Sequence, residues 1–288
     1  MKVSGWKKKL VLGFAAAALA AFSVGAADAD VLLEQGAKHV EAKRFAEAAE
    51  CFRKAAEQGS ARAQYDLGLC YSGGEGVPQD FVQAASWFRK AAEQGDPLAQ
   101  YDLGMCFVDG RGVAKDAKQA VELFRTSAEQ GYVKAQYNLG VCYARSIGVA
   151  QDHKQSAHWF KLAADQGYPP AQHDLGLCYT RGLGVARDHK QAIGLFRKAA
   201  DRGYPPAQFD LGVCFLQGEG VPQDPGQAAA WFRKSAEQGY PLAQFNLGLC
   251  YYRGAGVPQD PKQAAAWFRK AADQGFAPAQ KALKKLGY

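Results

Sequence analysis

The side chains of this 288-residue chain that could bind a metal or attack a substrate are chiefly its seven cysteines and five histidines. One cysteine, Cys51, stands apart from a regular series. The other six recur every 36 residues, as Cys70, Cys106, Cys142, Cys178, Cys214 and Cys250. A disulfide needs Cα atoms about 4.4–6.8 Å apart, whereas packed helices lie about 8–10 Å apart. We therefore expect small buried thiols in this series, and a Cys51–Cys70 pair stays open.

The histidines show no metal-ligand spacing. They are His39, His153, His158, His173 and His189, and no pair of them has a cysteine or carboxylate partner at a suitable interval. His153 and His158 are five residues apart, which places them on different faces of a helix. No Ser-His-Asp arrangement, phosphate-binding loop or dinucleotide-binding motif occurs. The sequence therefore predicts a protein that is not an enzyme, with no catalytic residue, no metal and no cofactor.

The cysteine interval belongs to a repeat that fills most of the chain. Six near-identical copies of Ala-Gln-x-x-Leu-Gly-x-x-(Tyr/Phe) begin at Ala63 and return every 36 residues. Leu67 and Tyr71 share one face of a predicted helix, which we name helix A. Gly inside a helix costs about 1 kcal/mol relative to Ala. The recurring Gly68 therefore predicts that a second helix, helix B, approaches closely.

Helix B is predicted to follow a loop that contains glycine. Gly74 and Gly76 tolerate positive φ angles there. Asp80, with Gln83 three residues later, forms a capping-box pattern that recurs at 116, 152, 188, 224 and 260. Helix caps explain these aspartates better than catalytic acids do. Neither helix can bury its apolar face alone, so stacked pairs must share a continuous core. We expect an all-α fold, a right-handed α/α solenoid of stacked helix-turn-helix repeats.

These motifs resemble the Sel-one-like repeat (SLR) family, relatives of the tetratricopeptide (TPR) repeats. The resemblance rests on A-Q-x-x-L-G-x-x-Y/F, G-x-G-V, D-x-x-Q-A and W-F-x-x-A-A-x-x-G, and it covers residues 31–288. Ser146 departs from the pattern at a loop glycine, and Leu123 and Leu195 stand in place of Trp. Family members are generally adaptors or scaffolds, so the resemblance implies binding of a protein or peptide.

Domain boundaries follow from the period. Residues 1–26 are a predicted signal peptide, with four Lys, an apolar run of about 15 residues and a small-residue cleavage point. An uncleaved anchor is the alternative, although a span needs about 20 apolar residues. The remaining units are a TPR-like unit at 27–59, six repeats (60–95, 96–131, 132–167, 168–203, 204–239 and 240–275, together 60–275) and a C-terminal capping helix at 276–288.

Charge limits the partners. The whole chain carries +7, and the leader holds four Lys and no acid, which leaves 7 − 4 = +3. A charge this small and dispersed is no nucleic-acid footprint. We expect a periplasmic or secreted monomer, with no membrane span after removal of the leader.

The predicted binding surface is the concave groove that helix A lines in TPR-like stacks. One set of rings lies two residues before the packing Leu, and a more variable set lies at the end of helix A. The candidates are Tyr65, Tyr101, Tyr137, His173, Phe209 and Phe245, with Arg145, Arg181, Tyr252 and Arg253. Aromatic residues and Arg are enriched at binding hot spots. Packing between repeats is the alternative explanation for the rings.

Two other functions stay open. Cysteine-rich SLR proteins are associated with β-lactam binding or slow hydrolysis, which implies cell-wall ligand binding as the alternative function. Their paired cysteines do not carry over, because Ala91 and Ala92 stand where the second cysteine would be. A structural component of the cell envelope would need self-association.

Overall fold

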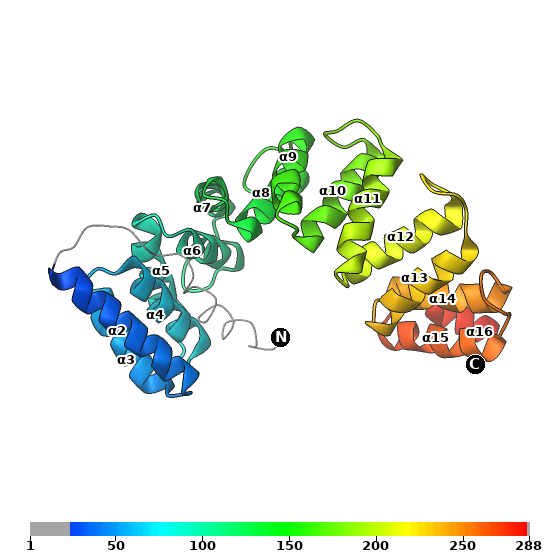
Figure 1. Cartoon of the computed structure of the whole chain (residues 1–288). Coiled ribbons are helices and arrows are strands. Elements are labelled where there is room, and N and C mark those ends of the chain that lie inside the picture. The colour runs from blue at the N-terminus through cyan, green and yellow to red at the C-terminus, as the bar shows by residue number, and fades with distance from the viewer. Residues whose placement is uncertain (1–23, 287–288) are drawn as a thin grey trace. The chain divides into compact units, whose positions relative to one another are not determined.

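The structure is a computed structural model that describes residues 24–286, so most of the predicted signal peptide lies outside the described residues. The chain divides into two compact units at Gln151/Asp152. Residues 24–286 form fifteen helices and no strand (Figure 1). None of the described helices is long and apolar enough to cross a membrane.

Among the described residues, the first unit contains seven helices and the second contains eight. In the first unit these are α2 (Val24–Glu41), α3 (Phe45–Glu57), α4 (Ala61–Gly73), α5 (Phe81–Glu93), α6 (Pro97–Asp109), α7 (Ala117–Glu129) and α8 (Val133–Arg145). In the second they are α9 (His153–Asp165), α10 (Pro169–Arg181), α11 (His189–Asp201), α12 (Pro205–Gln217), α13 (Pro225–Glu237), α14 (Pro241–Arg253), α15 (Pro261–Asp273) and α16 (Ala277–Lys285).

Within each unit, helix A packs against the helix B that follows it, as α4 does on α5 and α12 on α13 (Figure 1). The glycine of helix A makes this close packing possible. A Cβ built on Gly68 would lie 2.6 Å from Cδ1 of Phe88, and one on Gly212 would lie 2.7 Å from Cδ1 of Phe232. The predicted close approach at the recurring glycine is therefore confirmed, and it explains why Gly stands in the middle of a helix.

The aspartates that precede helix B are caps, as predicted. Asp80 accepts hydrogen bonds from the backbone N–H groups of Val82 (2.9 Å) and Gln83 (3.0 Å). The reciprocal half of the capping box is replaced by another bond, because the backbone N–H of Asp80 donates to the Tyr71 carbonyl of helix A at 3.0 Å. This second bond ties the start of helix B to the end of helix A.

Buried glutamines connect successive repeats. Gln64 donates from Nε2 to the Ala56 carbonyl (3.2 Å) and accepts at Oε1 from Gln94 (2.8 Å). The same relay recurs at Gln100, Gln208 and Gln244. These bonds satisfy polar groups that the short turns would otherwise bury unpaired.

Candidate binding surface on helix A

The helices A of the repeats are α4, α6 and α8 in the first unit and α10, α12 and α14 in the second. Their predicted ladder of rings lies against the phenylalanines of helix B. The ring centroids of Tyr65 and Phe88 are 5.7 Å apart, those of Tyr101 and Phe124 5.7 Å. Three further pairs have the same arrangement, namely His173–Phe196 (5.7 Å), Phe209–Phe232 (5.7 Å) and Phe245–Phe268 (5.4 Å).

Four of these rings also contact an aromatic residue of the next repeat. The pairs are Tyr101–Tyr132, His173–Tyr204, Phe209–Tyr240 and Phe245–Phe276, with centroids 5.2–5.7 Å apart in edge-to-face geometry. Tyr65 is 1% exposed and His173 8%, while Tyr101, Tyr137, Phe209 and Phe245 are half-buried. Packing within and between repeats accounts for Tyr65, Tyr101, His173, Phe209 and Phe245, and Tyr137 is half-buried.

The polar tips of the ladder bond to the following repeat. The Tyr65 hydroxyl donates to Oδ2 of Asp102 at 2.9 Å, and Asn138 Nδ2 donates to the Tyr101 hydroxyl at 3.4 Å. Each bond joins residues 37 positions apart, from one helix A to the next. The ladder is therefore a polar as well as an aromatic contact between repeats.

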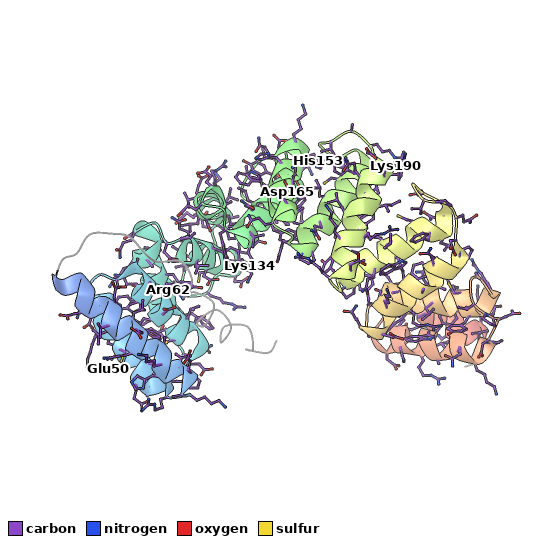
Figure 2. The ribbon with its side chains drawn as sticks, in the orientation of Figure 1. Glu50, Arg62, Lys134, His153, Asp165 and Lys190 are labelled. Carbon is purple, nitrogen blue, oxygen red and sulfur yellow. The ribbon has the colours of Figure 1, made fainter. Side chains whose placement is uncertain are left out.

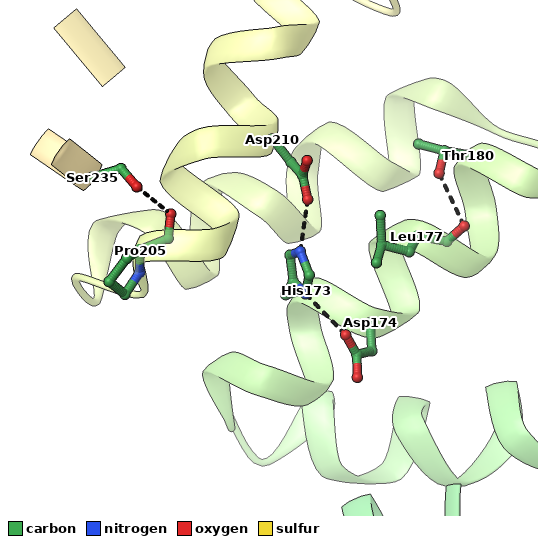
Figure 3. A network of polar contacts seen from close by, with 7 residues as sticks. All are labelled: His173, Asp174, Leu177, Thr180, Pro205, Asp210 and Ser235. Atoms are coloured by element: carbon green, nitrogen blue, oxygen red, sulfur yellow. Dashed lines mark hydrogen bonds and ion pairs between the residues drawn. The ribbon is translucent and has the colours of Figure 1, made fainter. Parts of the chain in front are cut away.

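His173 is the most polar member of the ladder and lies between two carboxylates (Figure 3). Its Nε2 is 2.7 Å from Oδ2 of Asp210, and its Nδ1 is 2.9 Å from Oδ1 of Asp174. Burial disfavours the charged ring, but the hydrogen bonds to Asp174 and Asp210 and their charges outweigh it and raise the pKa of His173 to about 9. The imidazolium thus joins α10 to α12 at neutral pH.

A second buried charge lies in the first unit, on α4. Arg62, labelled in Figure 2, bonds through Nε to Oδ2 of Asp66 at 3.0 Å. Burial raises the pKa of Asp66 to about 6, although Arg62 opposes this shift. Asp66 Oδ1 has no hydrogen-bond partner among the residues that the structure describes. The repeat pattern does not indicate this pair, since Arg62 has no basic counterpart in the later repeats except Lys134.

The variable candidates lie on the surface, unlike the rings. Arg145, Arg181, Tyr252 and Arg253 are exposed at the ends of α8, α10 and α14, and Tyr252 is 46% exposed. None of the three guanidinium groups makes a hydrogen bond or ion pair with any part of the chain that the structure describes. These side chains are available to an external ligand.

A cavity that the sequence did not indicate opens beside helix A in the first unit. It has a volume of about 210 Å³ and lies among α4, α5 and α6. Its lining combines apolar side chains such as Leu69 and Met105 with Asp102 and Asp109. Its lining also includes Cys106, the half-buried member of the cysteine series.

All seven cysteines are free thiols, including Cys51 and Cys70. Burial raises the pKa of Cys70 and Cys214 to about 12 and that of Cys142 and Cys178 to about 11. Because the thiolate is the reactive form, these groups are inert fillers of a small slot. Residues 24–286 contain no group of three His, Cys, Asp or Glu side chains that could hold a metal.

The chain is similar to known repeat proteins. The Sel1 repeat matches residues 18–60, 61–96, 97–132, 133–168, 169–204, 205–240 and 241–276, so it includes the segment where the pattern predicts a TPR-like unit. No curated protein matches the chain.

Two solved structures share the fold and about two-fifths of the sequence. A protective antigen of uropathogenic Escherichia coli strains that displays an SLR fold is 40% identical, with a TM-score of 0.83. The similarity covers 90% of this chain and 56% of the antigen, so the chain spans little more than half of that protein. A Sel1 repeat protein from Oxalobacter formigenes is 39% identical, with a TM-score of 0.76, covering 90% of this chain and 76% of the other. The chain therefore belongs to the Sel1 repeat family, as its motifs and its α-solenoid fold indicate.

Proposed function

We propose that this protein is an exported scaffold that binds a protein or peptide through the exposed ends of its helices A. Sel1 repeat solenoids are typically scaffolds for protein–protein interaction and are generally not catalytic. The observation that carries the proposal is a contrast inside the chain. The framework positions are nearly invariant, whereas one position at the end of helix A, exposed in all copies except the first, holds Gly73, Asp109, Arg145, Arg181, Gln217 and Arg253.

Packing does not dictate this variation, because the side chains concerned face solvent. Arg181 and Arg253 lie in the second unit, together with Tyr252, and all three are exposed. Arg and Tyr are favoured at binding hot spots because they combine a large contact area with hydrogen-bonding groups. Unpaired guanidinium groups favour an acidic partner.

Export is supported by the leader pattern of Lys2, Lys7, Lys8 and Lys9 followed by the apolar run from Leu10 to Val24. We expect the protein in the periplasm or outside the cell and as a monomer. Cell fractionation checks the first expectation, and recovery in the cytoplasm would contradict it. Sedimentation over a range of concentrations checks the second, since self-association would favour a structural role in the envelope.

Affinity capture from envelope and secreted extracts tests the binding proposal. The wild type is compared with an Arg181→Ala/Tyr252→Ala/Arg253→Ala variant and with a Lys190→Ala/Lys198→Ala control. The control also removes two positive charges, but from α11 (Lys190 is labelled in Figure 2). All five substituted residues are exposed, so the variants should stay folded.

We expect a protein that the wild type and the control retain and that the triple variant loses. Its affinity, measured with the purified partner, should fall at least about tenfold in the triple variant, because hot-spot residues cost more than about 1 kcal/mol each. Equal retention by all three forms would exclude these helix ends as the binding surface.

A further inference from the structure

One position on helix B differs between repeats in a way that the solenoid framework does not require. The residue before the core Phe is Trp87, Trp159, Trp231 or Trp267 in four repeats, and Leu123 or Leu195 in two. In three of the Trp repeats, a lysine three residues later covers the indole face. Its Nζ lies 3.9 Å from the ring centroid in the pair Lys90–Trp87 and 3.8 Å in Lys234–Trp231 and Lys270–Trp267. This slot therefore accepts an indole ring beneath a cation.

The repeat built from α6 and α7 lacks both of these groups. It has Leu123 in place of Trp and Thr126 in place of Lys, whereas the other Leu repeat keeps Lys198. Leu123 and Thr126 are smaller than the Trp and Lys that they replace, and they lie three residues apart on one face of the helix. Both differences therefore leave space in the same slot.

A third difference concerns an arginine of helix B, which in two other units donates to a tyrosine hydroxyl. Arg53 donates to the Tyr71 hydroxyl (3.5 Å), and Arg233 donates to the Tyr251 hydroxyl (2.7 Å). The equivalent of Arg53 is Arg89, which faces Phe107, a residue with no hydroxyl. Arg89 makes no hydrogen bond or ion pair with the part of the chain that the structure describes.

These three differences meet in one cavity. A cavity of about 520 Å³ lies among α5, α6 and α7, and its lining includes Leu123, Thr126, Phe107 and Arg89. Leu103 and Ala92 add to its apolar wall. A volume of this size is within the range of about 300–1,000 Å³ that is usual for ligand pockets. Two of its lining residues, Leu123 and Thr126, thus occupy the sequence positions at which three other repeats carry tryptophan and lysine.

We propose that this cavity binds an aromatic side chain of indole size, presented by a partner polypeptide beside an acidic residue. The equivalent slots identify the ring, since they hold tryptophan in the same framework. Arg89 supplies the pairing group for the acid, and Lys118 adds a second cation at the rim. Of the two rim acids, Glu122 lies 3.7 Å from Arg125, which leaves Glu93 as the one opposing charge. This site is separate from the helix ends and does not depend on their role.

The test is an NMR titration of the full-length ¹⁵N-labelled chain with two blocked tripeptides, Asp-Trp-Gly and Asp-Ala-Gly. We expect Asp-Trp-Gly to shift amide signals of α5, α6 and α7, and Asp-Ala-Gly to leave them in place. A Leu123→Trp/Thr126→Lys variant restores the side chains of the other repeats and should weaken binding at least about tenfold, because the protein's own indole then fills the slot. Leu195→Trp, in the second unit, is the matched control and should bind like the wild type.

Three results would overturn the proposal: no shift with Asp-Trp-Gly at millimolar concentration, equal shifts with Asp-Ala-Gly, or unchanged binding by the double variant. Thr126→Lys alone guards against a misfolded double variant, because Thr126 is exposed and its substitution disturbs no core contact. A folded Thr126→Lys protein supplies the cation that covers the indole in three other repeats, so it should bind Asp-Trp-Gly at least as tightly as the wild type, and weaker binding would count against the slot as the site. Arg89→Ala should remove the preference for Asp-Trp-Gly over Gly-Trp-Gly, and retention of that preference would exclude Arg89 as the partner of the acid.

Discussion

The polar residue that faces a ring of the ladder from the next repeat is an acid in some copies and an amide in others. Tyr65 faces Asp102, and His173 faces Asp210. Where the ring is Phe209, the corresponding polar residue is Asn246, whose Nδ2 instead donates to the Leu242 carbonyl at 2.8 Å. An acid is found only opposite rings that can donate a proton or carry charge, although Tyr101, which can also donate, faces Asn138. A buried carboxylate without a donor would be costly.

Replacing the charged contact by its neutral equivalent should remove a pH dependence. The pKa of His173, about 9, is above its ordinary value of 6.5, so protonation stabilises the folded chain. That contribution is complete below pH 6.5 and is lost as the pH rises through about 9. At 1.36 kcal/mol per pKa unit, the shift corresponds to about 3 kcal/mol. His173→Phe/Asp210→Asn copies the Phe209/Asn246 pair and should abolish this loss. Urea unfolding below and above this range measures it, and an unchanged difference between the two pH values would contradict the assignment.

Arg202 interrupts the glutamine relay between repeats. It occupies the place of Gln94 and Gln238, and it bonds to the Gly167 carbonyl. As a result, the buried Oε1 of Gln172 has no hydrogen-bond partner within residues 24–286. Arg202→Gln should restore the bond and raise the free energy of unfolding by about 0.5–1.5 kcal/mol. The reverse change, Gln238→Arg, is the matched control and should lower it, as denaturant melts would show.

At the scale of the element, glycine has opposite consequences on the two helices of a repeat. Gly212 of helix A is required, because Phe232 of helix B occupies the space that a side chain would need. Gly194 of helix B, on α11, has no atom within 4 Å of a Cβ built there, and it is exposed. The cost of glycine in a helix is therefore offset by packing at the first position and by nothing at the second.

Alanine at these two positions should shift stability in opposite directions. Gly194→Ala should stabilise the protein by about 0.5–1 kcal/mol, through better helix propensity alone. Gly212→Ala should destabilise it by about 1–3 kcal/mol, because the new Cβ overpacks the Phe232 ring. Thermal unfolding of both variants checks the pair. Stabilisation by both would show that the Phe232 ring moves to accommodate the new methyl group at little cost in free energy.

At the scale of the whole molecule, each unit is a series of contacts between sequence neighbours. Helices pack on the helix before and the helix after, as α12 does on α11 and α13. Stability in such a chain is close to a sum of repeat and interface contributions, so a defect should be felt mainly in adjacent repeats.

Phe232→Ala should show this locality. Removing a fully buried phenylalanine should cost about 3–5 kcal/mol. Amide hydrogen exchange should accelerate in α12, α13 and α14 and should change little in α3, α4 and α5 of the first unit. A uniform acceleration through both units would mean that the chain unfolds as one cooperative body. Phe52→Ala, in the first unit, is the matched variant and should give the opposite distribution.

The sequence by itself determined the period, the helix pairs and their caps, the glycine–phenylalanine packing and the absence of a recognisable catalytic motif. These features are local or recur at a fixed interval, so residue spacing and propensity are enough to predict them. The tertiary structure decided what lies between the repeats. An aromatic residue at Tyr65 or Phe209 suits packing and binding equally well, and only its contacts with the next repeat, Asp102 for Tyr65 and Tyr240 for Phe209, assign it to the repeat interface. The same holds for the cavity at Leu123, because a missing tryptophan leaves space only where neighbouring helices do not close over it.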